Sequence, residues 1–161
     1  MQAGVNYANE THGLDVVLQV EFAGGGYNRP AGRAAVETLH AAGADILFFS
    51  AGGETDWGAI AMAEELEIPV IAASNVAFMA PETIVAQMRK LKDPVVTQVL
   101  WDLYYGRPVA GVGDHGLTDG TAGLTPTALT EDFFGAELLA RVDELVERMM
   151  SGELYVPQNM F

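Results

Sequence analysis

The stretch ADILFFSAGGETDWGAIAMAEELEIPVIAASN, residues 44–75, decides the predicted fold. Two apolar runs of strand length, Ala44–Ser50 and Ile68–Ser74, flank a segment with helical periodicity at Asp56–Leu66. Because neither run alternates with polar residues, we expect each strand to be covered on both faces of a sheet. A strand, a helix and a second strand with short connections predict a right-handed βαβ crossover in a parallel sheet.

The flanking segments extend this alternation of strands and helices. Asp15–Phe22 is rich in valine and lies between glycines, which predicts a strand. Pro30–Ala42 has the start and the periodicity of a helix. Further along, Thr83–Arg89 suits a strand, and Asp93–Tyr105 suits a helix that a glycine ends. The predicted fold class is therefore α/β, a parallel sheet with flanking helices.

The last third of the chain has a different pattern. Pro108–Gly116 and Thr121–Leu129 flank a Thr-Asp-Gly turn at 118–120, which predicts a β-hairpin. Glu131–Ser151 is the clearest amphipathic helix, and an extended tail is expected at Tyr155–Pro157. The helix side chains expected to face a core are Leu138, Leu139, Val142, Leu145, Val146 and Met149.

Composition limits the classes of protein to which the chain can belong. With 161 residues, 50% of them hydrophobic and 19% charged, it has the length and composition of one globular domain. It contains no cysteine, which excludes a disulfide framework, a thiolate metal site and a cysteine nucleophile. Its apolar runs are far shorter than the ~20 residues that a membrane-spanning helix needs.

The net charge of −14 argues against a nucleic acid or an anionic membrane as partner. Eight Lys and Arg residues stand against 22 Asp and Glu, so the chain repels phosphate backbones at long range. The basic residues cluster only at Arg89, Lys90 and Lys92, which is too few for such a surface. We interpret the acidity as a source of solubility, because it does not identify a partner.

Three loops are candidates for a ligand site. In an open parallel sheet, ligands bind beyond the carboxyl ends of the strands, which here selects Gly24–Arg29, Ser50–Trp57 and Ser74–Met79. Gly52 and Gly53 in the second loop allow backbone N–H groups to approach a ligand, although a tight turn alone would also require glycine. The loop matches neither a phosphate-binding loop nor a dinucleotide fingerprint.

Three side chains near these loops have the chemistry to hold a polar, planar ligand. Tyr27 and Trp57 offer rings for stacking, or alternatively they pack over the end of the sheet. Lys90 follows a predicted strand and could donate to a sugar or base oxygen, or it is a solvated surface lysine. These residues alone leave both alternatives open.

The residue patterns give little support to catalysis. The Gly-x-Ser-x-Gly nucleophile elbow is absent, the three histidines are scattered, and no pair of carboxylates has a distinctive spacing. Asp114 and His115 are adjacent, but they have no third partner nearby in the sequence. We therefore predict no catalytic residue, no cofactor and no metal ligand.

Several short motifs occur in an order that a known family shares. Tyr27-Asn28-Arg29-Pro30 is followed by a helix ending in Gly-Ala-Asp at 43–45, and then by the loop Ala51-Gly52-Gly53. The later motifs are strands at Ile71–Ala77 and Pro81–Lys90, a helix from Asp93, a hairpin at Pro108–Leu124 and a Ser-Gly-Glu ending at 151–153. Over nearly its whole length the chain resembles the C-terminal half of substrate-binding proteins of the basic membrane protein family (BMP/Med). These proteins serve ABC-type importers, and purine nucleoside receptors are among them.

The resemblance implies the C-terminal portion of a two-lobed fold of the periplasmic binding protein type I kind. On this register, residues 1–80 form a second-lobe α/β segment, and residues 81–161 cross back toward the first lobe with a helix, a hairpin and a C-terminal helix. The N-terminal lobe and a signal peptide are then missing, and the chain alone is expected to expose surfaces that this lobe covers. Family members are periplasmic or lipid-anchored at the cell membrane, which implies an extracytoplasmic location.

The resemblance also implies a ligand site between two lobes that close about a hinge. Carried over by position, Tyr27 is the stacking aromatic, Gly52 the backbone contact and Lys90 the lysine that holds ribose and base. With their neighbours in the three loops, the expected ligand-binding residues are Tyr27, Gly52, Gly53, Trp57, Ser74, Asn75 and Lys90.

Two positions depart from the family pattern. Ser74, followed by Asn75, stands where the family has an aspartate, and Arg29 replaces another aspartate. A carboxylate that accepts from two ribose hydroxyls makes charge-assisted hydrogen bonds, whereas serine or asparagine makes neutral ones of about half the strength. The ligand specificity can therefore differ from that for an ordinary nucleoside.

The leading hypothesis is an extracytoplasmic solute-binding component of an ABC importer, with no catalysis. Its partners would be a small planar ligand such as a nucleoside, the permease subunits and the missing N-terminal lobe, but no nucleic acid. An alternative is a ligand-sensing domain of a regulator or signalling receptor with the same fold. A third is an enzyme of flavodoxin-like architecture that acts on a sugar or phosphate through Asp114 or His115.

Overall fold

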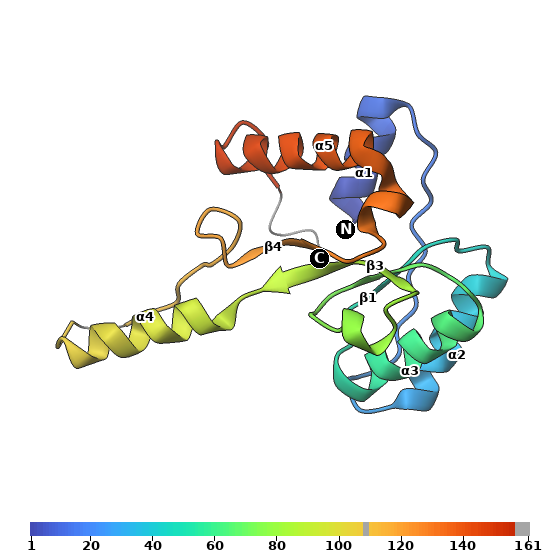
Figure 1. Ribbon diagram of the computed structural model, residues 1–161, viewed down its shortest axis with the longest axis horizontal. Coiled ribbons are helices and arrows are strands. Elements are labelled where there is room, and N and C mark those ends of the chain that lie inside the picture. Colours follow the sequence, from blue (N-terminus) through green and yellow to red (C-terminus); the bar gives the residue numbers. More distant parts are fainter. Residues whose placement is uncertain (108–109, 157–161) are drawn as a thin grey trace.

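The computed structural model describes residues 1–107 and 110–156, which form a four-stranded sheet flanked by helices (Figure 1). The strands are β1 (Leu47–Phe49), β2 (Val70–Ala72), β3 (Ile84–Lys90) and β4 (Ala122–Pro126), which are neighbours in that order. β1, β2 and β3 are parallel, and β4 runs antiparallel to β3. The α/β class with flanking helices is therefore confirmed.

Five α-helices and one short 3₁₀-helix accompany the sheet in the described residues. They are α1 (Gln2–His12), α2 (Arg29–Ala41), α3 (Gly53–Glu65), the 3₁₀-helix η1 (Ala77–Met79), α4 (Lys92–Tyr104) and α5 (Thr130–Met150). In Figure 1, α2 and α3 lie on one side of the sheet and α1 and α5 on the other, while α4 projects away from both groups. None of these helices is both long and apolar enough to cross a membrane.

Glycine contacts hold α2 and α3 unusually close together. A Cβ atom at Gly32 would overlap the carbonyl oxygen of Thr55, and one at Gly58 would overlap the carbonyl oxygen of Arg29. The start of α2 is fixed by Asn28, whose side chain accepts a hydrogen bond from the Ala31 N–H at 3.1 Å. The pair of helices can therefore lie together over one face of the sheet.

The core lies between this pair of helices and one face of the sheet. Leu47, Phe49, Val70 and Ala72 alternate along β1 and β2 and are buried, because their side chains point toward the helices. Phe48 and Ile71 point to the other face and are only partly buried, so the expectation of strands covered on both faces is correct for one face alone. The whole cluster comprises Val36, Leu47, Phe49, Ala59, Ile60, Met62, Ala63, Ile68, Val70, Ala72, Ala80 and Ile84.

The strand expected at Asp15–Phe22 does not form. A strand requires hydrogen bonds to a neighbouring strand, and this segment makes none. Instead, the Val16 backbone bonds to the side chain of Asn9, and the Gln19 amide donates to the Ala42 carbonyl. The segment thus has the composition of a strand, but it pairs with no other strand in the described chain.

The expected hairpin is also wrong. The partner of β4 is β3, with Met88 opposite Leu124, while residues 110–116 form no strand. The 118–120 turn exists, but it connects the segment after α4 to β4. Pro108 of the predicted hairpin and Pro157 of the predicted tail lie outside the described residues, and Tyr155 and Val156 have no regular structure.

The C-terminal helix forms as expected, but its apolar stripe is less buried than its sequence predicts. A kink at Gly135, where φ is 73°, separates its first turn from the rest. Leu138 is exposed, and the other five residues of the expected stripe are only partly buried. A side-chain bond from Arg148 to the Tyr7 hydroxyl, 3.0 Å long, joins α5 to α1.

Candidate functional site

A cavity of about 750 Å³ lies at the carboxyl ends of the three parallel strands. Its walls are residues 50–52 after β1, residues 73–75 after β2 and residues 88–93 at the end of β3, together with Asp56 and Thr125. The general rule for open parallel sheets selects this edge as the ligand-binding edge. The cavity is therefore the candidate site.

Four of the seven expected site residues meet in this cavity. Gly52, Ser74, Asn75 and Lys90 all line it, although they come from two separate loops and from the end of β3. Gly52 has a φ of 91° and stands at the N-cap of α3, so the backbone turns from strand to helix beside the cavity. These segments are far apart in the sequence, and the parallel sheet brings them together at one edge.

The two aromatic residues do not line the cavity. Tyr27 is 95% exposed, so its ring is free of packing on the rest of the described chain. Trp57 is 38% exposed and lies beneath the Arg29 guanidinium, 5.1 Å from ring centroid to Cζ. Arg29 also forms an ion pair with Glu54, so Trp57 belongs to a contact between the starts of α2 and α3.

The loop that carries Tyr27 is nevertheless held against the start of α3. Thr55 is 1% exposed, and its hydroxyl accepts from the Asn28 N–H at 3.0 Å and donates to the Gly25 carbonyl. A Cβ at Gly53 would lie 2.8 Å from the Gly26 carbonyl oxygen, so this expected site glycine lets the two loops meet. Sequence reasoning did not select Thr55, because it placed this residue in the loop before the predicted helix.

A second buried polar residue supports the loop after β2. Gln87 is 5% exposed on β3, and its Oε1 accepts from the N–H groups of Val76 and Ala77, both at 3.0 Å. These bonds fix the turn that follows Ser74 and Asn75. Sequence reasoning missed Gln87 as well, although it is the single amide in the apolar part of β3.

The charged residues of the cavity are three cations and two carboxylates. Arg89, Lys90 and Lys92 line one side, and none of them has an ion-pair partner among residues 1–107 and 110–156. Asp56 accepts a hydrogen bond from the Ala51 N–H at 2.9 Å, which occupies one of its oxygens. The cavity can therefore donate to an electron-rich group of a ligand.

A compact turn supports the β3 side of the cavity. The Leu91 N–H donates to the Thr121 carbonyl at 2.7 Å, and Asp119 accepts from the N–H groups of Gly116 and Thr121 and from the Thr121 hydroxyl. His115 Nδ1 lies 2.6 Å from the second oxygen of Asp119. The Thr121 hydroxyl, then His115 and the backbone N–H groups, hold the pKa of Asp119 well below its ordinary value.

We expect this turn to open only in strong acid. A carboxyl group whose pKa is lowered by folding stabilises the turn fully above its unfolded-state pKa, and the stabilisation is lost as the pH falls through the folded value. An NMR titration of the Gly116 and Thr121 amides should therefore show a midpoint below pH 3.8, the ordinary value for the carboxyl group. The variant Asp119→Asn should lack that transition, and a midpoint at or above pH 3.8 in the unmodified chain would contradict the assignment.

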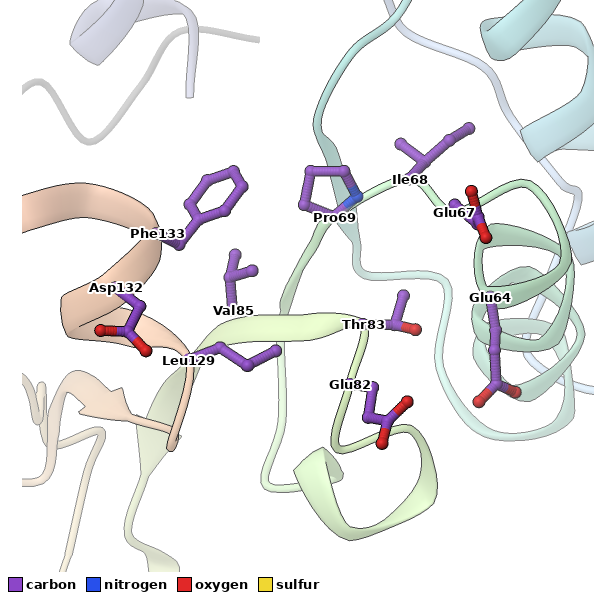
Figure 2. Close-up of a pocket in the computed structure, with 10 residues that line it drawn as sticks. All are labelled: Glu64, Glu67, Ile68, Pro69, Glu82, Thr83, Val85, Leu129, Asp132 and Phe133. Atoms are coloured by element: carbon purple, nitrogen blue, oxygen red, sulfur yellow. The ribbon is translucent and has the colours of Figure 1, made fainter.

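A second hollow, of about 580 Å³, lies at the opposite edge of the sheet. Figure 2 shows Phe133 at the start of α5 facing Pro69 across Val85, with Glu64 and Glu67 on the α3 side. Glu82 and Asp132 add two more carboxylates, and no Lys or Arg is among its lining residues. The two edges of the sheet thus differ in charge, because the cations gather at the carboxyl ends of the parallel strands.

The groups proposed for catalysis do not form a recognisable catalytic site. His115 is engaged with Asp119, and neither it nor Asp114 lines either hollow. In the described parts of the chain, no three His, Asp or Glu residues gather in a way that could hold a metal ion. The geometry offers hydrogen-bond donors and cations around a cavity, which suits binding.

Among the comparisons with known proteins, the one with solved structures found similar folds. No protein-family model matches the chain, and no curated protein matches it either. A crystal structure of an ABC transporter system solute-binding protein from Aeropyrum pernix K1 is similar over 98% of this chain and 52% of its own, with a TM-score of 0.82 and 23% identity. A second such protein, from Conexibacter woesei DSM 14684, is similar over 97% of this chain and 50% of its own, with a TM-score of 0.73 and 25% identity. The chain therefore spans about half the length of the solute-binding proteins whose fold it shares.

Proposed function

We propose that the chain is the ligand-binding half of an extracytoplasmic solute-binding protein of an ABC importer. The observation that carries the proposal is the cavity at the carboxyl ends of β1, β2 and β3, in a fold that matches half of two solute-binding proteins. A second lobe would cover the open side of the cavity, and closure of the two lobes would enclose the ligand. The permease subunits would receive that ligand.

The proposed ligand is a small, planar, polar molecule of the nucleoside kind. Ser74 and Asn75 offer neutral hydrogen-bonding groups, Lys90 offers a charged donor, and the Gly52 backbone can approach closely. Tyr27 is exposed on a loop held beside Gly53, so its ring is available to stack on a base once the second lobe closes. The proposed role requires no catalysis and no cofactor.

Calorimetric titration of the two-lobed protein that contains this chain tests the proposal. We expect saturable heat with at least one purine or pyrimidine nucleoside, and a roughly 10- to 100-fold weaker affinity after Lys90→Met, because a charge-assisted hydrogen bond is lost. Arg141→Met is the matched control, since it removes one cation that is paired with Glu137 on the exposed side of α5. Absence of heat with every nucleoside would refute the nucleoside ligand, and turnover of a ligand would refute a purely binding role.

A further inference from the structure

The cations of this acidic chain fall into two groups. Five of the eight form ion pairs with a carboxylate: Arg29, Arg33, Arg107, Arg141 and Arg148. The other three, Arg89, Lys90 and Lys92, line the cavity and have no ion-pair partner in the described residues. In a chain with 22 Asp and Glu residues, unpaired cations gather at this one place.

The three cations lie at the end of β3 and the start of α4. Arg89 lies opposite Gly123 in the β3–β4 ladder, and a Cβ at Gly123 would come within 3.1 Å of the guanidinium Nη2. The guanidinium therefore lies across a position that has no side chain. Lys90 ends β3, and Lys92 begins α4, so both lysines are attached to regular structure close to the ladder.

The charge of the cavity indicates how much negative charge a ligand can bring. Three cations stand against Asp56 and Asp93, which leaves a formal charge of +1. Asp56 accepts a hydrogen bond from the Ala51 N–H, so its negative charge stays in the cavity. There it would repel a ligand group with more than one negative charge. The hollow at the other edge has four carboxylates and no cation in its lining, so of these two sites only the candidate site has a net positive charge.

We propose that the solute carries a carboxylate, which Lys90 and Lys92 bind at the β3 end of the cavity, while Arg89, the preceding residue of β3, adds positive charge nearby. The inference rests on the proposed function, because it names the class of solute that the same site takes. A single negative charge matches the cavity charge of +1, and cationic N–H donors form their strongest hydrogen bonds with a carboxylate. A phosphate would bring close to two charges beside Asp56 and Asp93.

NMR titration of the 161-residue chain with matched ligands tests this inference. The probes are adenosine, adenosine 5′-carboxylic acid and adenosine 5′-monophosphate, together with nicotinamide and nicotinate, and the amides observed are residues 50–52, 73–75 and 88–93. We expect each carboxylate to bind at least ten-fold more tightly than its neutral counterpart, and the phosphate to bind no more tightly than the matching carboxylate. Lys90→Met and Lys92→Met should each reduce that preference several-fold, while Arg141→Met should leave it unchanged.

The outcomes separate the inference from the proposed function. Equal binding of adenosine and its carboxylic acid would overturn the inference and support the nucleoside ligand. Binding of nicotinate without any adenosine derivative would support the inference and overturn the nucleoside ligand. Tighter binding of the phosphate would overturn the choice of a carboxylate, and unchanged cavity amides with all five probes would overturn both proposals.

Discussion

Replacing Gly58 by alanine should lower the free energy of unfolding by about 3 kcal/mol, because the added methyl group overfills the contact between α2 and α3. A Cβ at this position would overlap the Arg29 carbonyl oxygen, and backbone atoms cannot rotate away as a flexible side chain can. The helices would have to separate, which would loosen the packing of Ile60 and Val36, both in the core. Gly32→Ala should have a comparable effect, because its Cβ would overlap the Thr55 carbonyl oxygen.

Gly4→Ala is the matched control for this effect. Gly4 also lies within a helix, but nothing lies within 4 Å of the Cβ that it would gain. Alanine there should be neutral or stabilising by roughly 0.5–1 kcal/mol, the ordinary preference of a helix for alanine over glycine. Urea unfolding followed by circular dichroism measures both variants through the midpoint at constant slope. A Gly58→Ala variant as stable as Gly4→Ala would show that α2 and α3 are not in close contact.

The central stretch was predictable because its local pattern and its final environment agree. The apolar runs around 47–49 and 70–72 are too short for a buried helix and too apolar for a surface, so a sheet core is the one place that suits them. Asn28 and Pro30 mark the start of α2 by chemistry that depends on the next few residues alone. In such segments the sequence contains all the information that the local structure needs.

The two wrong predictions about strands both concern long-range pairing. Asp15–Phe22 has the composition of a strand, but composition does not provide a neighbouring strand to bond with. Thr121–Leu129 was assigned to the nearest upstream segment, whereas its true partner, Ile84–Lys90, is separated from it by the whole of α4. Turn chemistry at 118–120 specifies where the chain reverses, but it does not specify with which strand the following segment pairs.

The site could be predicted in part for a related reason. The rule that loops after parallel strands meet at one edge selected the loops of Gly52 and Ser74, which do line one cavity, and Lys90, a separate candidate, lines it too. It could not predict that Thr55 and Gln87 would fix those loops, because their hydrogen bonds cross between elements. The cluster at 89–92 was visible in the sequence, but its significance depends on which cations form ion pairs, and these pairs form between residues that are distant in the sequence or brought together by the fold.

Helix α4 should exchange its amide hydrogens on the order of a thousand-fold faster than α3 when the 161-residue chain is studied alone. It contributes no buried residue, and its large apolar side chains Leu100, Trp101 and Leu103 are all at least half exposed. A helix of 13 residues with no packed face is marginal in water, whereas α3 buries six residues, four of them in the hydrophobic core. Hydrogen exchange followed by mass spectrometry or NMR measures the two helices in one sample.

A pair of substitutions distinguishes an uncovered helix from a packed one. Ile60→Ala in α3 should cost about 2–4 kcal/mol, because Ile60 is 3% exposed and its removal leaves a cavity. Leu100→Ala in α4 should change stability by less than about 0.5 kcal/mol in the isolated chain.

If the second lobe of the proposed function covers α4, then in the two-lobed protein the same Leu100→Ala change becomes destabilising and α4 becomes protected from exchange. Slow exchange of α4 in the isolated chain would instead show that the helix is stable without a second lobe, which would contradict this prediction.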